Sequence, residues 1–382
     1  MRSNPEGRLW AWHNQPNQSF LTDCVKLSVF IKRGSLLDPG FLVMRMLVTG
    51  GGGFLGLYLV EGLVAAGHQV RVLCRGRYAA LDALGVETVQ GDLRDAEIVS
   101  KACYGAESVF HAAAIPGVWG PRSLYFGINF MGTQNVVAAC QKHGVRRLIY
   151  TSSPSVIFDG HEHLNGTESL AYPTRWLCHY PHSKALAEQA VLSAAKSDGL
   201  RTVSLRPHLI WGPRDNHLIP RLITAARRGR LRQVGNGHNM VSVAYVENVA
   251  AAHLMAEESL RDSAKISGKA YFINEPEAVN LWEWINLLLQ RSGLPPVTQR
   301  ISANAAWRLG TVLEGVWTLL RLGGEPPMTR FVASQLAGSH SYSIEAAARD
   351  FGYRPTVSIA EGLRRIQPDL DALGRSQKGK TG

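Results

Sequence analysis

The chain has 382 residues, of which 45% are apolar and 19% are charged, and its formal net charge is +11. This balance excludes a disordered chain, because enough apolar side chains are present to bury a large core. No long basic tract is interleaved with aromatic residues, which argues against a nucleic-acid-binding protein. The five cysteines form no Cys-x-x-Cys pair, so we expect reduced thiols and no bound metal ion. The positive charge instead favours anionic ligands such as phosphates and carboxylates, or an anionic membrane surface.

Residues 1–43 show no clear helical or strand period and carry Asn, Gln, Pro and Gly, so we expect an extension outside the fold. Their order of residue types does not match a signal peptide. The most apolar later stretch, 305–322, is interrupted by Arg308, Glu314 and Arg321, which argues against a membrane-spanning helix. Together these features predict a cytoplasmic protein.

Short apolar runs alternate with helical patterns from residue 45 onward. This alternation is typical of a parallel sheet with helices on both faces, so the sequence predicts a Rossmann-type, doubly wound α/β fold. The expected strands cover residues 46–48, 70–74, 88–89, 108–111, 147–151 and 202–206. The expected helices between them cover residues 55–66, 95–103, 129–143 and 182–196.

The pattern becomes less regular after residue 206. We interpret residues 44–206 as the Rossmann domain, residues 207–370 as a smaller, mostly helical substrate lobe, and residues 371–382 as a flexible tail. Segments between about 240 and 273 are expected to return to the sheet. Helices are expected near residues 218–230, 281–291, 303–321, 328–336 and 343–349, and apolar runs at 240–246 and 270–273.

A glycine-rich loop follows the first expected strand. Gly50, Gly53 and Gly56 let the backbone turn sharply and approach a ligand closely, and Phe54 and Leu55 open the helix that follows. The positive end of that helix favours a bound anion. The sequence therefore predicts that this loop binds the pyrophosphate of a dinucleotide, although a flexible loop without a ligand would look similar.

Three further strand ends carry residues suited to the rest of a dinucleotide. Arg75 follows the second strand, where an arginine accommodates the 2′-phosphate of NADP(H); the alternative is a solvated arginine. Asp92 and Leu93 follow the third strand, where a carboxylate can accept a hydrogen bond from the adenine amino group. The alternative for Asp92 is a helix cap, a role for which Asp95 is also available. Ala112 and Ala113 follow the fourth strand and leave room for the cofactor or for tight packing.

Tyr180 and Lys184 share one face of an expected helix, one turn apart. A nearby ammonium favours a phenolate, so we expect Lys184 to lower the pKa of Tyr180 and to help it exchange a proton with a substrate oxygen. Ser153 ends the fifth strand, where its hydroxyl can hold the same oxygen. The alternatives are an exposed polar helix face for the pair and a turn cap for Ser153.

Together these motifs resemble the extended short-chain dehydrogenases/reductases, in the branch that resembles 3β-hydroxysteroid dehydrogenases, over nearly all of residues 45–366. The resemblance implies that Ser153 and Tyr180 are catalytic and that Lys184 also binds the nicotinamide ribose. It further implies that Pro207 and Leu209 flank the nicotinamide and that Asn129 helps to order the site.

Residues 205–213, 324–331 and 350–355 are similar to bacterial reductases that act on long-chain 2-alkyl-3-oxoalkanoates in olefinic hydrocarbon biosynthesis. That resemblance implies NADPH-dependent reduction of a 3-keto group to the 3-hydroxy acid. Oxidation of a 3β-hydroxysteroid or a sterol-4α-carboxylate is the main alternative. A sugar-nucleotide epimerase or dehydratase, and a dinucleotide sensor without catalysis, are more distant ones.

The C-terminal half contains two features that bear on partners. Residues 307–322 are apolar with few charges, which predicts a helix packed into the lobe, an apolar wall for acyl chains, or a surface for a membrane or pathway enzyme. The arginines within 227–232 suit a phosphate or a substrate carboxylate. We expect a lipid-like small-molecule substrate and a homodimer.

Overall fold

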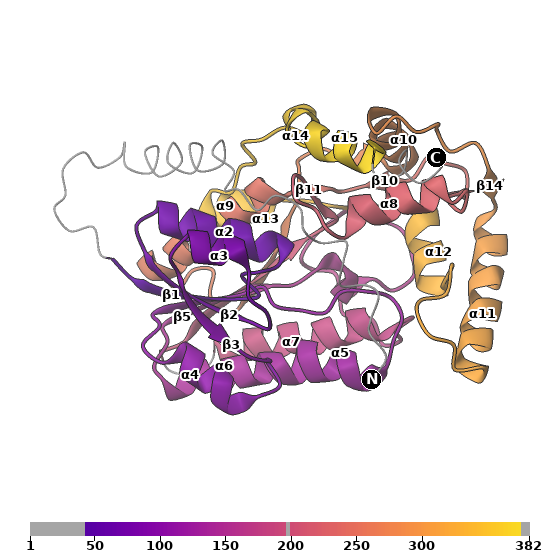
Figure 1. Cartoon of the computed structure of the whole chain (residues 1–382). Coiled ribbons are helices and arrows are strands. Elements are labelled where there is room, and N and C mark those ends of the chain that lie inside the picture. The colour runs from indigo at the N-terminus through magenta and orange to yellow at the C-terminus, as the bar shows by residue number, and fades with distance from the viewer. Residues whose placement is uncertain (1–42, 196–198, 376–382) are drawn as a thin grey trace.

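The computed structural model describes residues 43–195 and 199–375. Seven parallel strands form one sheet in the order β12-β7-β5-β4-β1-β2-β3 (Figure 1). The order reverses between β1 and β4, and ligands of doubly wound sheets bind at such a switch point. The seven strands are β1 (Arg45–Thr49), β2 (Gln69–Cys74), β3 (Glu87–Gln90), β4 (Ser108–His111), β5 (Arg147–Thr151), β7 (Arg201–Pro207) and β12 (Lys269–Ile273).

Short strands pair outside the main sheet. A four-stranded sheet has the order β13-β10-β15-β6, and two-stranded sheets join β11 to β8 and β14 to β9. Their bounds are β6 (His163–Gly166), β8 (Ile210–Trp211), β9 (Gln233–Val234), β10 (Met240–Val241), β11 (Ala244–Tyr245), β13 (Val279–Asn280), β14 (Arg300–Ile301) and β15 (His340–Tyr342).

Helices cover both faces of the main sheet and build the lobe (Figure 1). A π-helix, η2 (Phe126–Met131), and a 3-10 helix, η3 (Pro154–Ile157), lie close to β4 and β5 in the chain. The helices around the sheet are α2 (Phe54–Ala65), α3 (Ala79–Ala83), α4 (Ala96–Cys103), α5 (Arg122–Tyr125), α6 (Gly132–Lys142), α7 (His179–Ala194), α9 (Val246–Asp262) and α13 (Glu345–Phe351). The others are α8 (Leu218–Arg227), α10 (Leu281–Arg291), α11 (Ala303–Leu319), α12 (Arg330–Ala337), α14 (Ile359–Arg365) and α15 (Gln367–Arg375).

Each face of the sheet has its own apolar core because side chains alternate along a strand. Met46 and Val48 of β1 pack in one core with α2 and α9, whereas Leu47 packs in the other with α4, α6 and α7. The lobe has a separate core rich in tryptophan, which includes Trp211, Trp282 and Trp284. Burial on both faces explains why the strands read as short, continuous apolar runs.

Several elements differ from the sequence prediction. α9 was not predicted as a helix, and it covers the sheet beside α2. α7 begins at His179 and not at residue 182, so Tyr180 lies in its first turn. The expected helix over 129–143 is divided into η2 and α6. Residues 371–375 are helical and do not form a tail, while residues 376–382 and the proposed extension 1–42 lie outside the described residues.

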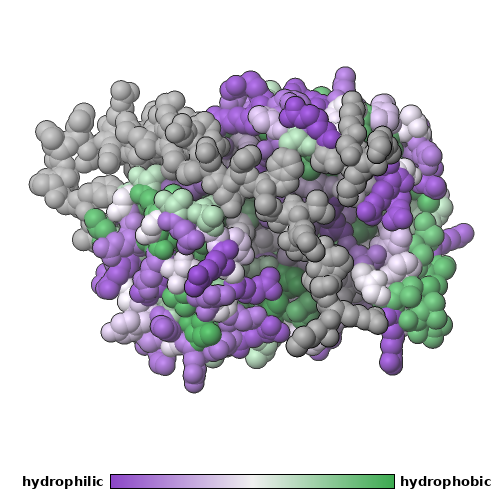
Figure 2. All heavy atoms as spheres, in the orientation of Figure 1, coloured by the Kyte–Doolittle hydropathy of each residue, from purple (hydrophilic) through white to green (hydrophobic). Residues whose placement is uncertain are grey.

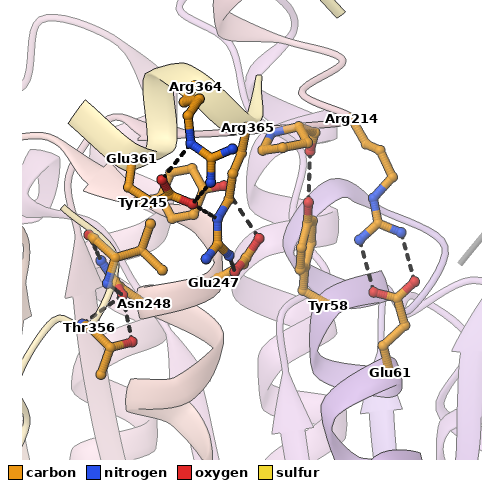
Figure 3. A network of polar contacts seen from close by, with 12 residues as sticks. Tyr58, Glu61, Arg214, Tyr245, Glu247, Asn248, Thr356, Glu361, Arg364 and Arg365 are labelled. Carbon is orange, nitrogen blue, oxygen red and sulfur yellow. Dashed lines mark hydrogen bonds and ion pairs between the residues drawn. The ribbon is translucent and has the colours of Figure 1, made fainter. Parts of the chain in front are cut away.

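A buried ion pair joins the helix after the glycine loop to the substrate lobe. Arg214, in the turn after β8, forms two hydrogen bonds of 2.7 and 2.8 Å with the carboxylate of Glu61 on α2 (Figure 3). The same guanidinium lies 4.0 Å from the ring centre of Tyr58, whose hydroxyl donates to Pro213 O at 3.0 Å. These contacts hold α2, and with it the glycine loop, against the lobe.

Replacing Arg214 with Ala is expected to lower the free energy of unfolding by about 3–5 kcal/mol, because it leaves the Glu61 carboxylate buried and unpaired. The Glu61 side chain is 1% exposed and that of Arg214 is 22% exposed. Denaturant unfolding checks the change. Arg364→Ala is the matched control, since the Arg364 side chain is 75% exposed in its pair with Glu361, and it should unfold close to the wild-type midpoint. An equal free energy of unfolding for Arg214→Ala and wild type would contradict a stabilising role for the ion pair between Arg214 and Glu61.

Candidate active site

The glycine loop connects β1 to α2 at the switch point. Gly50 has a φ of +76°, and a Cβ atom there would lie 2.8 Å from Ala113 Cα. A Cβ atom on Gly56 would lie 2.1 Å from Gly50 O. Gly53 N–H donates to Gly50 O at 2.9 Å and closes the turn. Only glycine fits positions 50 and 56 without moving backbone, which agrees with the predicted close turn.

The amino end of α2 is suited to an anion. Gly53 is its N-cap and supplies no side-chain hydrogen bond, and the first turn contains no acidic residue. The first N–H groups of a helix have no partner within the helix, and its dipole favours negative charge there. The loop and the helix end therefore fit a dinucleotide pyrophosphate.

The carboxyl ends of β2 and β3 bring two predicted cofactor residues near each other. Arg75 is exposed after β2. Asp92 follows β3 and binds Arg94 through hydrogen bonds of 2.9 and 2.8 Å, and these hydrogen bonds lower the pKa of Asp92 to about 2. Asp95, and not Asp92, caps α4 by accepting from two backbone N–H groups. The Tyr78 ring, which the sequence analysis did not single out, covers Gly52 of the glycine loop.

A buried histidine connects three strand and helix ends beneath the site. His111, at the end of β4, lies 2.6 Å from Thr49 Oγ1 through Nδ1 and 2.9 Å from Thr133 Oγ1 through Nε2. Thr133 donates its own proton to Asn129 O at 2.6 Å, so it accepts from His111 Nε2–H. Thr49 then donates to Nδ1 and accepts from Ala113 N–H at 3.3 Å. Burial lowers the pKa of His111 to about 3, so the ring stays neutral in this chain of hydrogen bonds.

Asn129 lies in η2 and orders the loop after β4, as the family resemblance implied. Its Oδ1 accepts from Ile115 N–H at 2.8 Å, and its Nδ2 donates to Ile115 O at 3.2 Å. The same Nδ2 donates to Ser183 Oγ at 3.1 Å, and Ser183 donates to Tyr180 O at 2.9 Å. The side chain therefore holds both the loop and the first turn of α7.

Ser153 and Tyr180 are brought together from β5 and α7. The Ser153 hydroxyl lies near enough to act on the pKa of the Tyr180 phenol, and the Tyr125 ring centre lies 6.5 Å from that of Tyr180 in an edge-on arrangement. Ser153 Oγ also accepts from Ser155 N–H at 3.2 Å and caps η3, which agrees with the turn cap that the sequence offered as the alternative. The hydroxyls of Ser153 and Tyr180 can bind one oxygen atom between them.

Lys184 lies one turn after Tyr180 and is 2% exposed. Its Nζ donates to Thr151 O at 2.6 Å and lies 4.2 Å from the ring centre of Tyr150. Burial lowers the pKa of Lys184 to about 7, and the charge of Glu188 opposes this shift.

The expectation that Lys184 lowers the pKa of Tyr180 is wrong for this structure. Burial raises the pKa of Tyr180 to about 12, and the nearby Ser153 hydroxyl acts in the opposite direction. The Lys184 amino group donates its hydrogen bond to the Thr151 carbonyl. Burial lowers its pKa to about 7, so a smaller fraction of it is charged at neutral pH. Tyr180 is therefore a protonated phenol at neutral pH.

A buried ion pair fixes α7 on β7. The Glu188 carboxylate binds Arg206 Nη2 at 2.6 Å and Nε at 3.0 and 3.1 Å. Ser204 and Tyr172 donate to the same carboxylate at 2.6 and 2.7 Å. Glu188 follows Lys184 by one helical turn, so this pair sets the position of the Tyr180 and Lys184 face.

The segment after β7 has an unusual backbone. Leu209 has a φ of +37°, a region that side chains other than glycine rarely adopt. His208 N–H donates to Asn274 Oδ1 at 3.2 Å, and Ala244 N–H donates to Leu209 O at 3.3 Å. Pro207 ends β7, which places this segment at the same edge of the sheet as the glycine loop.

A model of the 3-beta hydroxysteroid dehydrogenase/isomerase family matches residues 47–301, which is more than half of the chain. The chain belongs to this family. As a member, it is an NAD(P)-dependent oxidoreductase with a Rossmann fold, and it acts on a small molecule with a nicotinamide dinucleotide as cofactor.

Three known proteins resemble this chain over most of its length. A 2-alkyl-3-oxoalkanoate reductase from Stenotrophomonas maltophilia is 49% identical and covers 85% of this chain and 98% of its own. A decarboxylating sterol-4-alpha-carboxylate 3-dehydrogenase from Mus musculus is 36% identical and covers 86% of this chain and 92% of its own. The solved structure of MoeE5 in complex with UDP-glucose and NAD has a TM-score of 0.65 and 25% identity, and covers 85% of this chain and 97% of its own.

We expect this protein to lose stability in mild acid. Burial lowers the pKa of His111 to about 3 and that of His253 to about 4, whereas histidines in an unfolded chain titrate near 6.5. Below about pH 6.5 the unfolded state binds protons that the folded state does not, so the free energy of unfolding should fall by a few kcal/mol toward pH 4. Denaturant unfolding at several pH values checks this. His253→Gln should show a shallower decline, and a flat profile between pH 7 and 5 would contradict the buried neutral rings.

Proposed function

We propose that this family member reduces the 3-keto group of a long-chain 2-alkyl-3-oxoalkanoate to the 3-hydroxy acid with NADPH, as a step in olefinic hydrocarbon biosynthesis. The observation that carries the proposal is the cluster of Ser153, Tyr180 and Lys184 at the carboxyl edge of the sheet. The 49% identity to a reductase named for this substrate supports the choice of substrate.

The reaction adds a hydride to C3 of the substrate and a proton to its oxygen. Bound NADPH supplies the hydride. Tyr180, which is a protonated phenol at neutral pH, donates the proton. Ser153 donates a hydrogen bond to the same oxygen and stabilises the negative charge that develops on it.

The remaining proposed site residues bind the cofactor. Lys184, whose pKa lies near 7, would hold the nicotinamide ribose from its place under Tyr180. Pro207 and Leu209 would flank the nicotinamide, and the strained backbone at Leu209 is consistent with a functional constraint there. The pyrophosphate and adenosine would contact Gly50, Gly53, Phe54, Leu55, Gly56, Arg75, Asp92, Leu93, Ala112 and Ala113.

The preference for NADPH is assigned to Arg75. Its exposed guanidinium after β2 can bind a 2′-phosphate, and an arginine bond to such a group contributes about 1.5–3 kcal/mol. Arg75→Ala is therefore expected to raise the KM for NADPH about tenfold or more and to leave the KM for NADH nearly unchanged. Steady-state kinetics with both cofactors check this. An equal change for both would show that Arg75 does not read the 2′-phosphate.

A second candidate reaction is the oxidation of a sterol-4α-carboxylate at its 3-hydroxyl, supported by the 36% identity to the mouse dehydrogenase. The two reactions are separated by following absorbance at the nicotinamide band with each substrate. The proposal expects NADPH consumption with a synthetic 2-alkyl-3-oxoalkanoate and no NAD(P)H formation with the sterol. The reverse result would favour the sterol enzyme, and no turnover with either would favour a dinucleotide sensor.

A further inference from the structure

α11 presents Ala306, Gly310 and Glu314 to the protein and most of its large apolar residues to solvent. Ala306 and Gly310 face inward, and a Cβ atom on Gly310 would lie 2.6 Å from Thr329 C. Glu314 completes this inner stripe, where its carboxylate binds Arg330 Nε at 2.7 Å. The helix is therefore held on α12 by close backbone approach and an ion pair, which leaves its large side chains uncovered.

The outer side of α11 and the residues after it form what we call the α11 apolar face. Seven of the thirteen large apolar side chains that are exposed in the described part of the chain belong to it. Figure 2 shows the hydrophobic patch over this helix. Its members and exposed fractions are Trp307 (43%), Leu309 (42%), Val312 (62%), Val316 (36%), Leu319 (81%), Leu320 (62%) and Leu322 (42%).

The charges on this face are positive. Arg308 and Arg321 are exposed, and neither forms an ion pair with a residue in 43–195 or 199–375. Glu314 is the one acidic residue in 300–324, and its carboxylate is buried against Arg330. Exposed arginines continue along β14 and the turn before β9, to which β14 pairs: Arg228, Arg230, Arg232 and Arg300.

The segment after α11 contacts the catalytic region. Glu325 accepts a hydrogen bond from Val118 N–H at 3.1 Å, and Val118 lies in the loop after β4. The charge of Glu325 also acts on Tyr125, whose ring contacts that of Tyr180. The α11 apolar face is thus continuous with the side of the molecule that holds the proposed substrate site.

We propose that the α11 apolar face docks on an anionic lipid bilayer. Large apolar side chains next to arginines, without exposed acidic residues, are typical of helices that lie in the membrane interface. Arginines near an anionic surface strengthen binding to it. No helix in residues 43–195 and 199–375 is long and apolar enough to cross a bilayer. This inference goes beyond the proposed function and depends only on the exposed residues of the α11 apolar face and the arginines beside it.

Vesicle flotation tests the docking with the full chain. The vesicles contain phosphatidylcholine with about a quarter phosphatidylglycerol, against phosphatidylcholine alone. We expect binding to the anionic vesicles that weakens at high salt. The double variant V312E/L319E places carboxylates at two highly exposed positions of the face. Its affinity for the anionic vesicles should be lower than that of the wild type by a factor of about ten or more. The matched control Y104E/L164E changes two equally exposed apolar residues outside the face and should bind like wild type.

Circular dichroism and thermal unfolding confirm that each variant is folded, and turnover of a short, water-soluble 3-keto acid should match wild type in all of them. Absence of wild-type binding, or equal binding of V312E/L319E, would overturn the proposal. So would a wild-type self-associated species that V312E/L319E dissociates, because the face would then cover a second copy. These readouts measure binding and assembly, so their failure is distinct from failure of the proposed reaction.

Discussion

Tyr180→Phe is expected to lower kcat between about a hundredfold and ten-thousandfold, the range that a lost general acid or base produces. The change removes one hydroxyl that lies near Ser153 and leaves the ring in place against Tyr125. NADPH binding should persist, since the variant keeps the glycine loop and Lys184. Single-turnover and steady-state kinetics, with a fluorescence titration of NADPH, check both parts.

Tyr125→Phe is the matched control for Tyr180→Phe. The Tyr125 hydroxyl donates to Trp119 O at 3.0 Å and is given no role in proton transfer. Its removal is expected to change kcat less than about tenfold, because it breaks a single neutral hydrogen bond. Wild-type turnover in Tyr180→Phe, or equal losses in the two variants, would remove Tyr180 from the mechanism.

Gly56→Ala should weaken NADPH binding by about tenfold to a hundredfold. The new Cβ atom would lie 2.1 Å from Gly50 O and 2.9 Å from Gly51 Cα, so the loop backbone must move. Overpacking of this kind costs about 1–3 kcal/mol. If this cost destabilises the loop conformation that binds NADPH, the affinity falls by about tenfold to a hundredfold. Isothermal titration with NADPH measures the change.

Gly52→Ala separates this effect from a general loss of loop flexibility. A Cβ atom at Gly52 would meet the Tyr78 ring at 2.2 Å, but that side chain is 37% exposed and can rotate away. Its affinity for NADPH should therefore stay close to wild type. Equal affinities of Gly56→Ala and wild type would contradict the assignment of this loop to the pyrophosphate.

The parallel sheet could be predicted from the sequence because its strands are buried on both faces and stand out as short apolar runs. α9 could not, because it begins at Val246 directly after β11, and its N-cap Tyr245 supplies no side-chain hydrogen bond. α7 likewise starts after Cys178 without a side-chain cap, so its first turn was placed too late. Helices without capping residues lack the local signal on which such predictions depend.

In the candidate site, too, some features could be predicted from the sequence and others could not. Ser153, Tyr180 and Lys184 were predicted from residue type and spacing, and the structure brings them to one edge of the sheet, while their catalytic roles stay a prediction. The hydrogen bonds of His111 with Thr49 and Thr133 were missed, because they join residues far apart in the chain. The pKa of Tyr180 was also misjudged, because burial depends on tertiary packing that a spacing of four residues does not reveal.

Transfer of a label tests the central claim most directly. NADPH carrying deuterium at the transferable C4 position is incubated with a synthetic long-chain 2-alkyl-3-oxoalkanoate, and the product is analysed by mass spectrometry. The proposed reaction predicts a 3-hydroxy acid with one deuterium at C3, formed in step with NADPH oxidation. Absence of the hydroxy acid, or a product without deuterium at C3, would contradict it.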